Sequence, residues 1–136
     1  MQKITLDSNV WRDPLFINWL QSDRSVHETH ICPIIVYLET RLWYDMRGLT
    51  EADYREDLIK LKTQVVLFSK PHTETVIALT RQSHLPFRQH ARDFMIGAIV
   101  LAEESVLITQ NTRHFVWLPE HQLTTPQEFL QAAVFE

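Results

Sequence analysis

Glycine and cysteine are scarce in this chain of 136 residues, and each scarcity excludes a class of protein. The two glycines, Gly48 and Gly97, are too few for the loops G-x-G-x-x-G and G-x-x-x-x-G-K-[ST], so dinucleotide and P-loop nucleotide binding are excluded. Cys32 stands alone, which excludes a disulfide scaffold and a cysteine-based zinc site. The histidines form no H-x-x-x-H pattern, which argues against a zinc protease.

Long apolar runs and an excess of positive charge are also missing. The most apolar stretch, residues 94–102, is far shorter than the ~20 residues that cross a bilayer. No basic segment followed by an apolar one opens the sequence, so we expect no signal peptide and a cytoplasmic protein without membrane association. The net charge of −4 argues against a general nucleic-acid coat, but it is compatible with an acidic metal site that has a local basic rim.

Apolar runs typical of strands alternate with segments of helical periodicity. We expect strands at residues 4–6, 29–32, 65–69 and 106–109, with 65–69 as a central strand. We expect helices to begin at Pro14, Pro33, Thr50, Lys70, about His90 and Pro126. This order predicts a single α/β domain over residues 1–136, in which a mainly parallel sheet is covered by helices on both faces.

Three carboxylates stand in apolar surroundings. Asp7 ends the first strand, Glu39 lies within the second helix, and Asp93 lies near the start of the most apolar helix. A buried charge without a partner is costly, so such residues are usually paired, cap a helix or bind a metal. The plainer alternatives are an Asx turn for Asp7 and a favourable helix-dipole contact for Asp93. Glu39 has no basic partner four residues later, because position 43 is Trp.

A fourth polar segment, residues 109–114, follows the last clear strand. A plain turn or helix cap is one explanation for its Thr109 and Asn111. However, ligand sites in open parallel sheets lie at the carboxyl ends of the strands, so these side chains could meet the three carboxylates at one edge. Such a set offers hard oxygen ligands and no soft ones, which suits Mg²⁺ or Mn²⁺.

In this order the motifs resemble the PIN domain, and more narrowly the VapC-like ribonuclease toxins of toxin–antitoxin pairs. The resemblance rests on LDSNV at residues 6–10, PIIV at 33–36 with Glu39 after it, RDFMIGA at 92–98 and ITQNTRHF at 108–115. It implies a PIN-like three-layer α/β/α fold and an endoribonuclease that depends on Mg²⁺ or Mn²⁺. It also implies an RNA substrate, a small antitoxin partner and a homodimer.

The resemblance also implies roles for individual residues. Asp7, Glu39 and Asp93 match the core acidic positions, and Asn111 falls where many members carry a fourth acid. We expect Asp7 and Asp93 to bind the metal, Glu39 to hold an activated water or act as general base, and Asn111 to orient a ligand. We expect at least one of these acids to have a raised pKa, because the carboxylates repel one another.

Two further groups of residues complete the predicted site. The supporting residues are Ser8, Asn9 and Thr109. The candidates for RNA contact are Arg88, Arg92 and Arg113, since phosphate contacts by basic side chains position a nucleic acid.

Competing functions are distinguished by single positions. A catalytically silent PIN-like module that binds RNA or protein is the main alternative. The intact Asp7, Glu39 and Asp93 argue against it, whereas Asn111 and His114, which stand where acids are common, keep it open. A haloacid-dehalogenase-like phosphatase needs Asp-x-Asp after the first strand, but position 9 is Asn. A receiver-like phospho-acceptor needs a lysine after a late strand, and none follows residues 106–109.

Overall fold

The computed structural model describes residues 2–25 and 28–134. Within them, five parallel strands form one sheet in the order β3-β2-β1-β4-β5. The strands are β1 (Gln2–Leu6), β2 (Glu28–Pro33), β3 (Thr63–Val66), β4 (Val106–Ile108) and β5 (Leu123–Thr124). The predicted α/β class and parallel sheet are confirmed.

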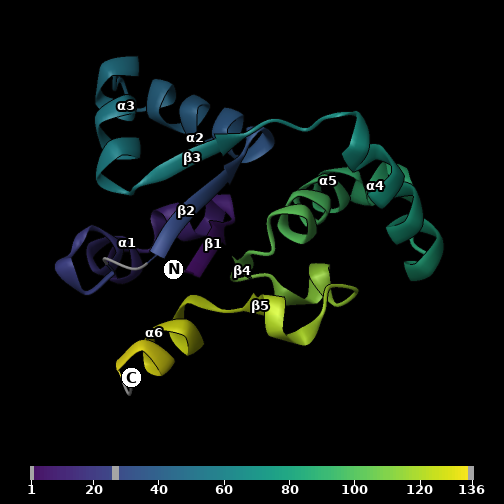
Figure 1. Cartoon of the computed structure of the whole chain (residues 1–136). Helices are drawn as coiled ribbons and strands as arrows, with labels where there is room; N and C mark the ends of the chain where they lie inside the picture. The colour runs from purple at the N-terminus through teal and green to yellow at the C-terminus, as the bar shows by residue number, and fades with distance from the viewer. Residues whose placement is uncertain (1, 26–27, 135–136) are drawn as a thin grey trace.

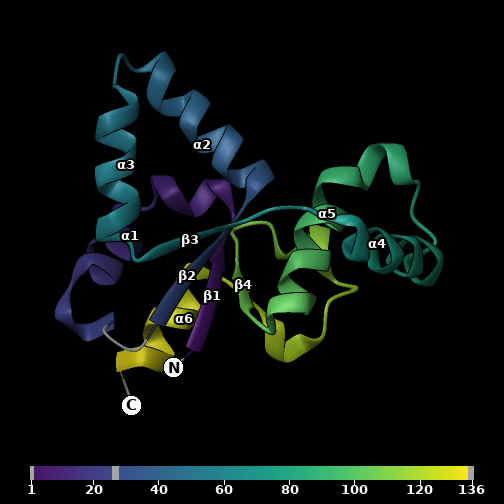
Figure 2. The same cartoon turned by 45° about the horizontal axis from the view of Figure 1, so that its top comes forward.

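Helices connect the strands and flank the sheet. The α-helices are α1 (Pro14–Gln21), α2 (Ile34–Met46), α3 (Glu51–Lys60), α4 (Lys70–Ser83), α5 (Phe87–Glu103) and α6 (Pro126–Val134). Short 3₁₀-helices are η1 (Ser8–Arg12), η2 (Asp23–Ser25), η3 (Thr112–Phe115) and η4 (Glu120–Gln122). Figures 1 and 2 show α2 paired with α3 on one side of the sheet and α4 paired with α5 on the other. No helix of the described residues is long and apolar enough to span a membrane.

Local signals in the sequence explain several helix ends. The Asp13 carboxylate caps α1 by accepting the Phe16 N–H at 3.2 Å. Thr50 and Asp53 form a reciprocal capping box at the start of α3. Gly48 follows the end of α2 with φ +75°, a conformation that glycine adopts without steric cost.

A continuous core fixes β1 in the middle of the sheet. Ile4 and Leu6 are fully buried and belong to the same cluster as Phe16 of α1 and Ile96 of α5. The register pairs Leu6 with Ile108, so the chain leaves β1 and β4 at the same level. Asp7 extends this pairing, because its N–H donates to the Ile108 carbonyl at 3.0 Å. The core therefore holds Asp7 rigidly at the carboxyl edge of the sheet.

Two predicted boundaries and the position of one strand in the sheet were wrong, and one strand was missed. The strand predicted at 65–69 is β3 at Thr63–Val66, and it is an edge strand that pairs only with β2. The apolar run misled because it continues into the exposed connection, where Leu67 is 66% exposed. Helix α5 begins at Phe87 rather than His90, directly after Pro86. The two-residue strand β5 was missed, because so short a segment has no periodicity to detect.

Candidate active site

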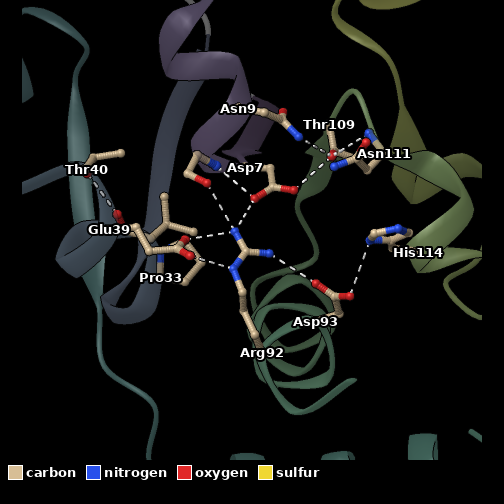
Figure 3. A network of polar contacts seen from close by, with 12 residues as sticks. Asp7, Asn9, Pro33, Glu39, Thr40, Arg92, Asp93, Thr109, Asn111 and His114 are labelled. Atoms are coloured by element: carbon tan, nitrogen blue, oxygen red, sulfur yellow. Dashed lines mark hydrogen bonds and ion pairs between the residues drawn. The ribbon is translucent and has the colours of Figure 1, made fainter. Parts of the chain in front are cut away.

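The guanidinium of Arg92, from the first half of α5, lies among the predicted acidic residues at the carboxyl edge of the sheet (Figure 3). Its Nε and Nη2 donate to the two carboxylate oxygens of Glu39, both at 2.8 Å. This bidentate arrangement is the strongest form of arginine–carboxylate contact. This contact connects α5 to α2 at the carboxyl edge of the sheet.

The same guanidinium reaches the other two acids. Its Nη2 donates to Asp7 Oδ1 at 2.6 Å and to Ser8 Oγ at 3.2 Å. Its Nη1 donates to Asp93 Oδ1 at 3.1 Å. The structure thus brings Asp7, Glu39 and Asp93 together around one positive charge.

Asp7 is the most enclosed member of this cluster, with only 2% of its surface exposed. The Thr109 hydroxyl donates to its Oδ2 at 2.8 Å, and the Ser8 N–H donates to its Oδ1 at 2.8 Å. Both carboxylate oxygens therefore have fixed donors, which offset the cost of burying the charge. The turn after β1 and the first residue after β4 together orient Asp7.

The remaining predicted residues form a loop-to-loop network beside Asp7. Asn9 Nδ2 donates to Thr109 Oγ1 at 3.3 Å, and Asn9 Oδ1 accepts the Gln110 N–H at 3.2 Å. Asn111 joins through its backbone, whose N–H donates to Thr109 Oγ1 at 3.0 Å, while the residue itself is exposed. The ligand-orienting role of the Asn111 side chain stays a prediction.

Burial and the neighbouring charges shift two pKa values in the cluster. Burial raises the pKa of Asp93, the nearby Arg92 and His114 oppose that rise, and the Asp7 charge adds to it. The expected raised pKa is therefore found at Asp93, with desolvation rather than repulsion as its largest cause. For Arg92, burial works against the charge, but the hydrogen bond to Glu39 and the charge of Asp7 outweigh it and raise the pKa.

The oxygens around Arg92 match a hard divalent cation in chemical type but not in spacing. They are carboxylate and hydroxyl oxygens, and the carboxylates already surround a cationic group. Among residues 2–25 and 28–134, no three Asp, Glu, His or Cys side chains are spaced to hold a metal together. The Arg92 guanidinium separates the acids, so a metal that bound to all three would take its place.

Only two of the three predicted RNA-contact arginines are free of the acid cluster. Arg88 and Arg113 are exposed, whereas Arg92 is engaged by all three carboxylates. His114, whose role the sequence left open, lies with Nδ1 3.7 Å from Asp93 Oδ2. The position of Arg92 beside Asp93 in the sequence was the available sign that it could reach the same site.

Comparison with solved structures identifies the fold. A toxin–antitoxin complex from Klebsiella pneumoniae contains a chain with a TM-score of 0.67 and 21% identity, covering 90% of this chain and 97% of that one. VapBC2 from Rickettsia felis, bound to a DNA fragment from its promoter, gives a TM-score of 0.56 and 17% identity, with coverages of 91% and 98%. The chain has a PIN-like fold.

A third structure with this PIN-like fold is PAE2754 from Pyrobaculum aerophilum. It gives a TM-score of 0.62 at 15% identity and covers 99% of this chain and 91% of its own. No protein-family model and no curated protein matches the sequence. The predicted resemblance is thus confirmed at the level of the PIN-like fold.

Proposed function

We propose that this PIN-like chain is a Mg²⁺- or Mn²⁺-dependent endoribonuclease and the toxin of a type II toxin–antitoxin pair. The observation that carries the proposal is that the carboxylates of Asp7, Glu39 and Asp93 all contact the guanidinium of Arg92 at the carboxyl edge of the sheet. The fold supports it, because similar chains occur in a toxin–antitoxin complex and in VapBC2.

The chain's own groups divide the work at this site. Asp7 and Asp93 would hold the metal, and Thr109 and the Ser8 N–H keep the Asp7 carboxylate in one orientation. Glu39 is the most exposed of the three acids and would accept a proton from the attacking water as general base. A bound Mg²⁺ or Mn²⁺ would supply Lewis acidity and offset the negative charge that develops on the phosphodiester.

Cleavage assays with isosteric variants test this function. Asp7→Asn and Asp93→Asn should each lower the rate of RNA cleavage in Mg²⁺ or Mn²⁺ by at least about a hundredfold, since each loses a charged ligand. Glu74→Gln removes one charge from an exposed position of α4 and should cleave at the parent rate. Parent-like cleavage by Asp7→Asn and Asp93→Asn would refute the proposal.

The main alternative is a catalytically silent PIN-like module that binds RNA or protein. The ion pairs of Arg92 favour it, because its guanidinium contacts all three acids and lies where a metal shared by them would bind. The two functions differ in their response to Mn²⁺. A silent module binds RNA without cutting it at any Mn²⁺ concentration, whereas the nuclease cuts once Mn²⁺ is added.

The partners follow from the toxin assignment. We propose a small antitoxin protein as partner, a homodimeric assembly and a cytoplasmic location. A short reading frame directly upstream that encodes such a protein, and whose product suppresses cleavage when co-expressed, is the expected result. Light scattering of the purified chain measures whether it is a dimer.

A further inference from the structure

A basic site near the acid cluster consists of two arginines that contact the indole of Trp43 in α2. The guanidinium carbon of Arg12, at the end of η1, is 5.4 Å from the centre of this ring. The guanidinium carbon of Arg47, just after α2, is 4.7 Å from it. Both arginines are exposed, and each guanidinium lies within cation–π range of the same indole.

Among the described residues, these two charges have no acidic partner, since none of the ion pairs involves Arg12 or Arg47. The carboxylate next to Arg12, that of Asp13, accepts hydrogen bonds from the Phe16 N–H and from Gln110 Nε2 instead. Two unpaired guanidinium groups around one ring present a positive surface that attracts anions.

The basic site lies next to the proposed catalytic residues. A cavity of about 120 Å³ is lined by Ser8, Arg12, Glu39, Thr40 and Trp43. A separate cleft of about 490 Å³ is lined by residues that include Arg12, Trp43 and Arg47. Arg12 and Trp43 line both spaces, so the cleft and the cavity at Glu39 adjoin the same two side chains.

We propose that the cleft at Arg12, Trp43 and Arg47 binds the RNA strand next to the phosphate that is cut. This inference rests on the proposed nuclease function. Arg12 and Arg47 contact backbone phosphates, and the Trp43 ring keeps both guanidinium groups oriented toward the cleft. The site offers the RNA a positively charged surface next to the acid cluster, whose carboxylates repel the RNA phosphates.

An acidic protein segment could satisfy the same charges, but the geometry favours RNA. The cleft and the cavity at Glu39 share Arg12 and Trp43 as lining residues, so a strand cut at the acid cluster passes close to these side chains. RNA also presents phosphates at regular intervals along its length, which suits two guanidinium groups that contact the same ring.

Binding measured without cleavage tests the inference. The probe is a fluorescein-labelled single-stranded RNA of mixed sequence, titrated with the full chain in EDTA and followed by anisotropy. The double variant Arg12→Gln/Arg47→Gln should bind roughly tenfold more weakly than the parent. Because each neutralised phosphate of a single strand contributes ~0.7, the slope of log affinity against log salt should fall by about 1.4.

The variant Trp43→Leu tests whether the ring orients the two guanidinium groups, because it leaves their charges unchanged. It keeps both arginines, so its affinity should fall while the salt slope stays at the parent value. The matched control is Arg55→Gln/Lys60→Gln, which removes the same charge from the exposed side of α3 and should bind like the parent. Circular dichroism and thermal melting confirm that each variant is folded.

Each other outcome overturns the inference. It is wrong if Arg12→Gln/Arg47→Gln binds RNA like the parent, if the Arg55/Lys60 control loses as much affinity, or if the parent binds no RNA. If the Arg12→Gln/Arg47→Gln variant binds RNA like the parent but no longer binds a polyglutamate peptide that the parent binds, the cleft is a site for an acidic protein segment instead. If Asp7→Asn loses cleavage while Arg12→Gln/Arg47→Gln binds and cuts RNA normally, the nuclease function stands and only the cleft assignment falls.

Discussion

At the scale of single residues, Arg92 is the counter-ion of three carboxylates and would therefore compete with a divalent metal for them. Arg92→Gln removes this competition. We expect Mn²⁺ to bind the variant roughly tenfold more tightly, a gain of about 1.4 kcal/mol, as measured by isothermal titration calorimetry. Without Mn²⁺, the variant should unfold at a lower temperature, because its acids lose their partner.

A matched control for this experiment lies one helical turn away. Arg88 is exposed on the same helix and forms none of the ion pairs of the described residues, so Arg88→Gln should bind Mn²⁺ like the parent. Equal or weaker Mn²⁺ binding by Arg92→Gln would show that Arg92 does not occupy the metal position.

The Thr109 hydroxyl is the second residue-scale determinant, since it donates to the buried Asp7 carboxylate. Thr109→Val conserves the volume but leaves Asp7 Oδ2 without this donor. We expect the free energy of unfolding to fall by about 1–3 kcal/mol, as measured by urea denaturation. Thr109→Ser retains the hydroxyl and should keep most of the stability. A Thr109→Val variant as stable as Thr109→Ser would contradict this role.

The sequence indicated the acids directly, but it indicated their partner only by its position next to Asp93. Asp7, Glu39 and Asp93 could be selected because apolar residues surround them in the sequence. Arg92 was predicted to contact RNA, because basic side chains position a nucleic acid through its phosphates. Only the packing of α5 against the end of β1 and α2 shows that its long side chain turns back to the acids.

At the scale of elements, α5 packs closely against the segment after η3 through Gly97. A Cβ atom at this position would overlap the ring of Trp117. Gly97→Ala should therefore destabilise the chain by about 1–3 kcal/mol, although alanine favours a helix. Thermal and urea unfolding measure the loss.

A double-mutant cycle tests the cause of that loss. In a Trp117→Leu background the ring is absent, so Gly97→Ala should be neutral or stabilising, by up to about 1 kcal/mol. An equal cost of Gly97→Ala in both backgrounds would show that Trp117 is not the obstacle.

Elements with their own local signals were predicted well, and elements that depend on partners were not. Helix α1 has its Asp13 cap and Pro14 start, and α3 has its capping box, so both boundaries follow from sequence. Strand β5 exists because Leu123 and Thr124 pair with β4, and nothing local marks them. The edge position of β3 likewise follows from strand order, which an apolar run does not reveal.

At the scale of the whole molecule, the strand order explains why distant motifs meet. With β1 between β2 and β4, Asp7 stands between the segment that leads to α2 and the one that begins with Thr109. The alternation of strands and helices predicts a parallel sheet, and the resemblance to PIN domains predicts this convergence. The Arg12–Trp43–Arg47 cleft was not predicted, because it depends on how η1 packs against α2.

Overall stability should depend on pH through His30, a buried residue of β2 in the middle of the sheet. Burial lowers the pKa of His30 from 6.5 to about 3. Its Nδ1 lies 2.8 Å from Thr63 Oγ1, and its buried Nε2 has no hydrogen-bond partner among the described residues. A protonated ring would therefore bury a charge and an unpaired N–H.

The sign of the effect follows from the two states. Below pH 6.5 the unfolded chain binds a proton at His30 that the folded chain does not bind until about pH 3. The free energy of unfolding should therefore fall as the pH is lowered from 6.5 to 5, by up to about 1.4 kcal/mol per pH unit from this residue. Urea denaturation of the parent and of His30→Gln over this range isolates the contribution, since the variant lacks the titrating ring. Parallel curves for the two proteins would mean that His30 takes up its proton over the same pH range in the folded and unfolded chains, which contradicts a pKa lowered by burial.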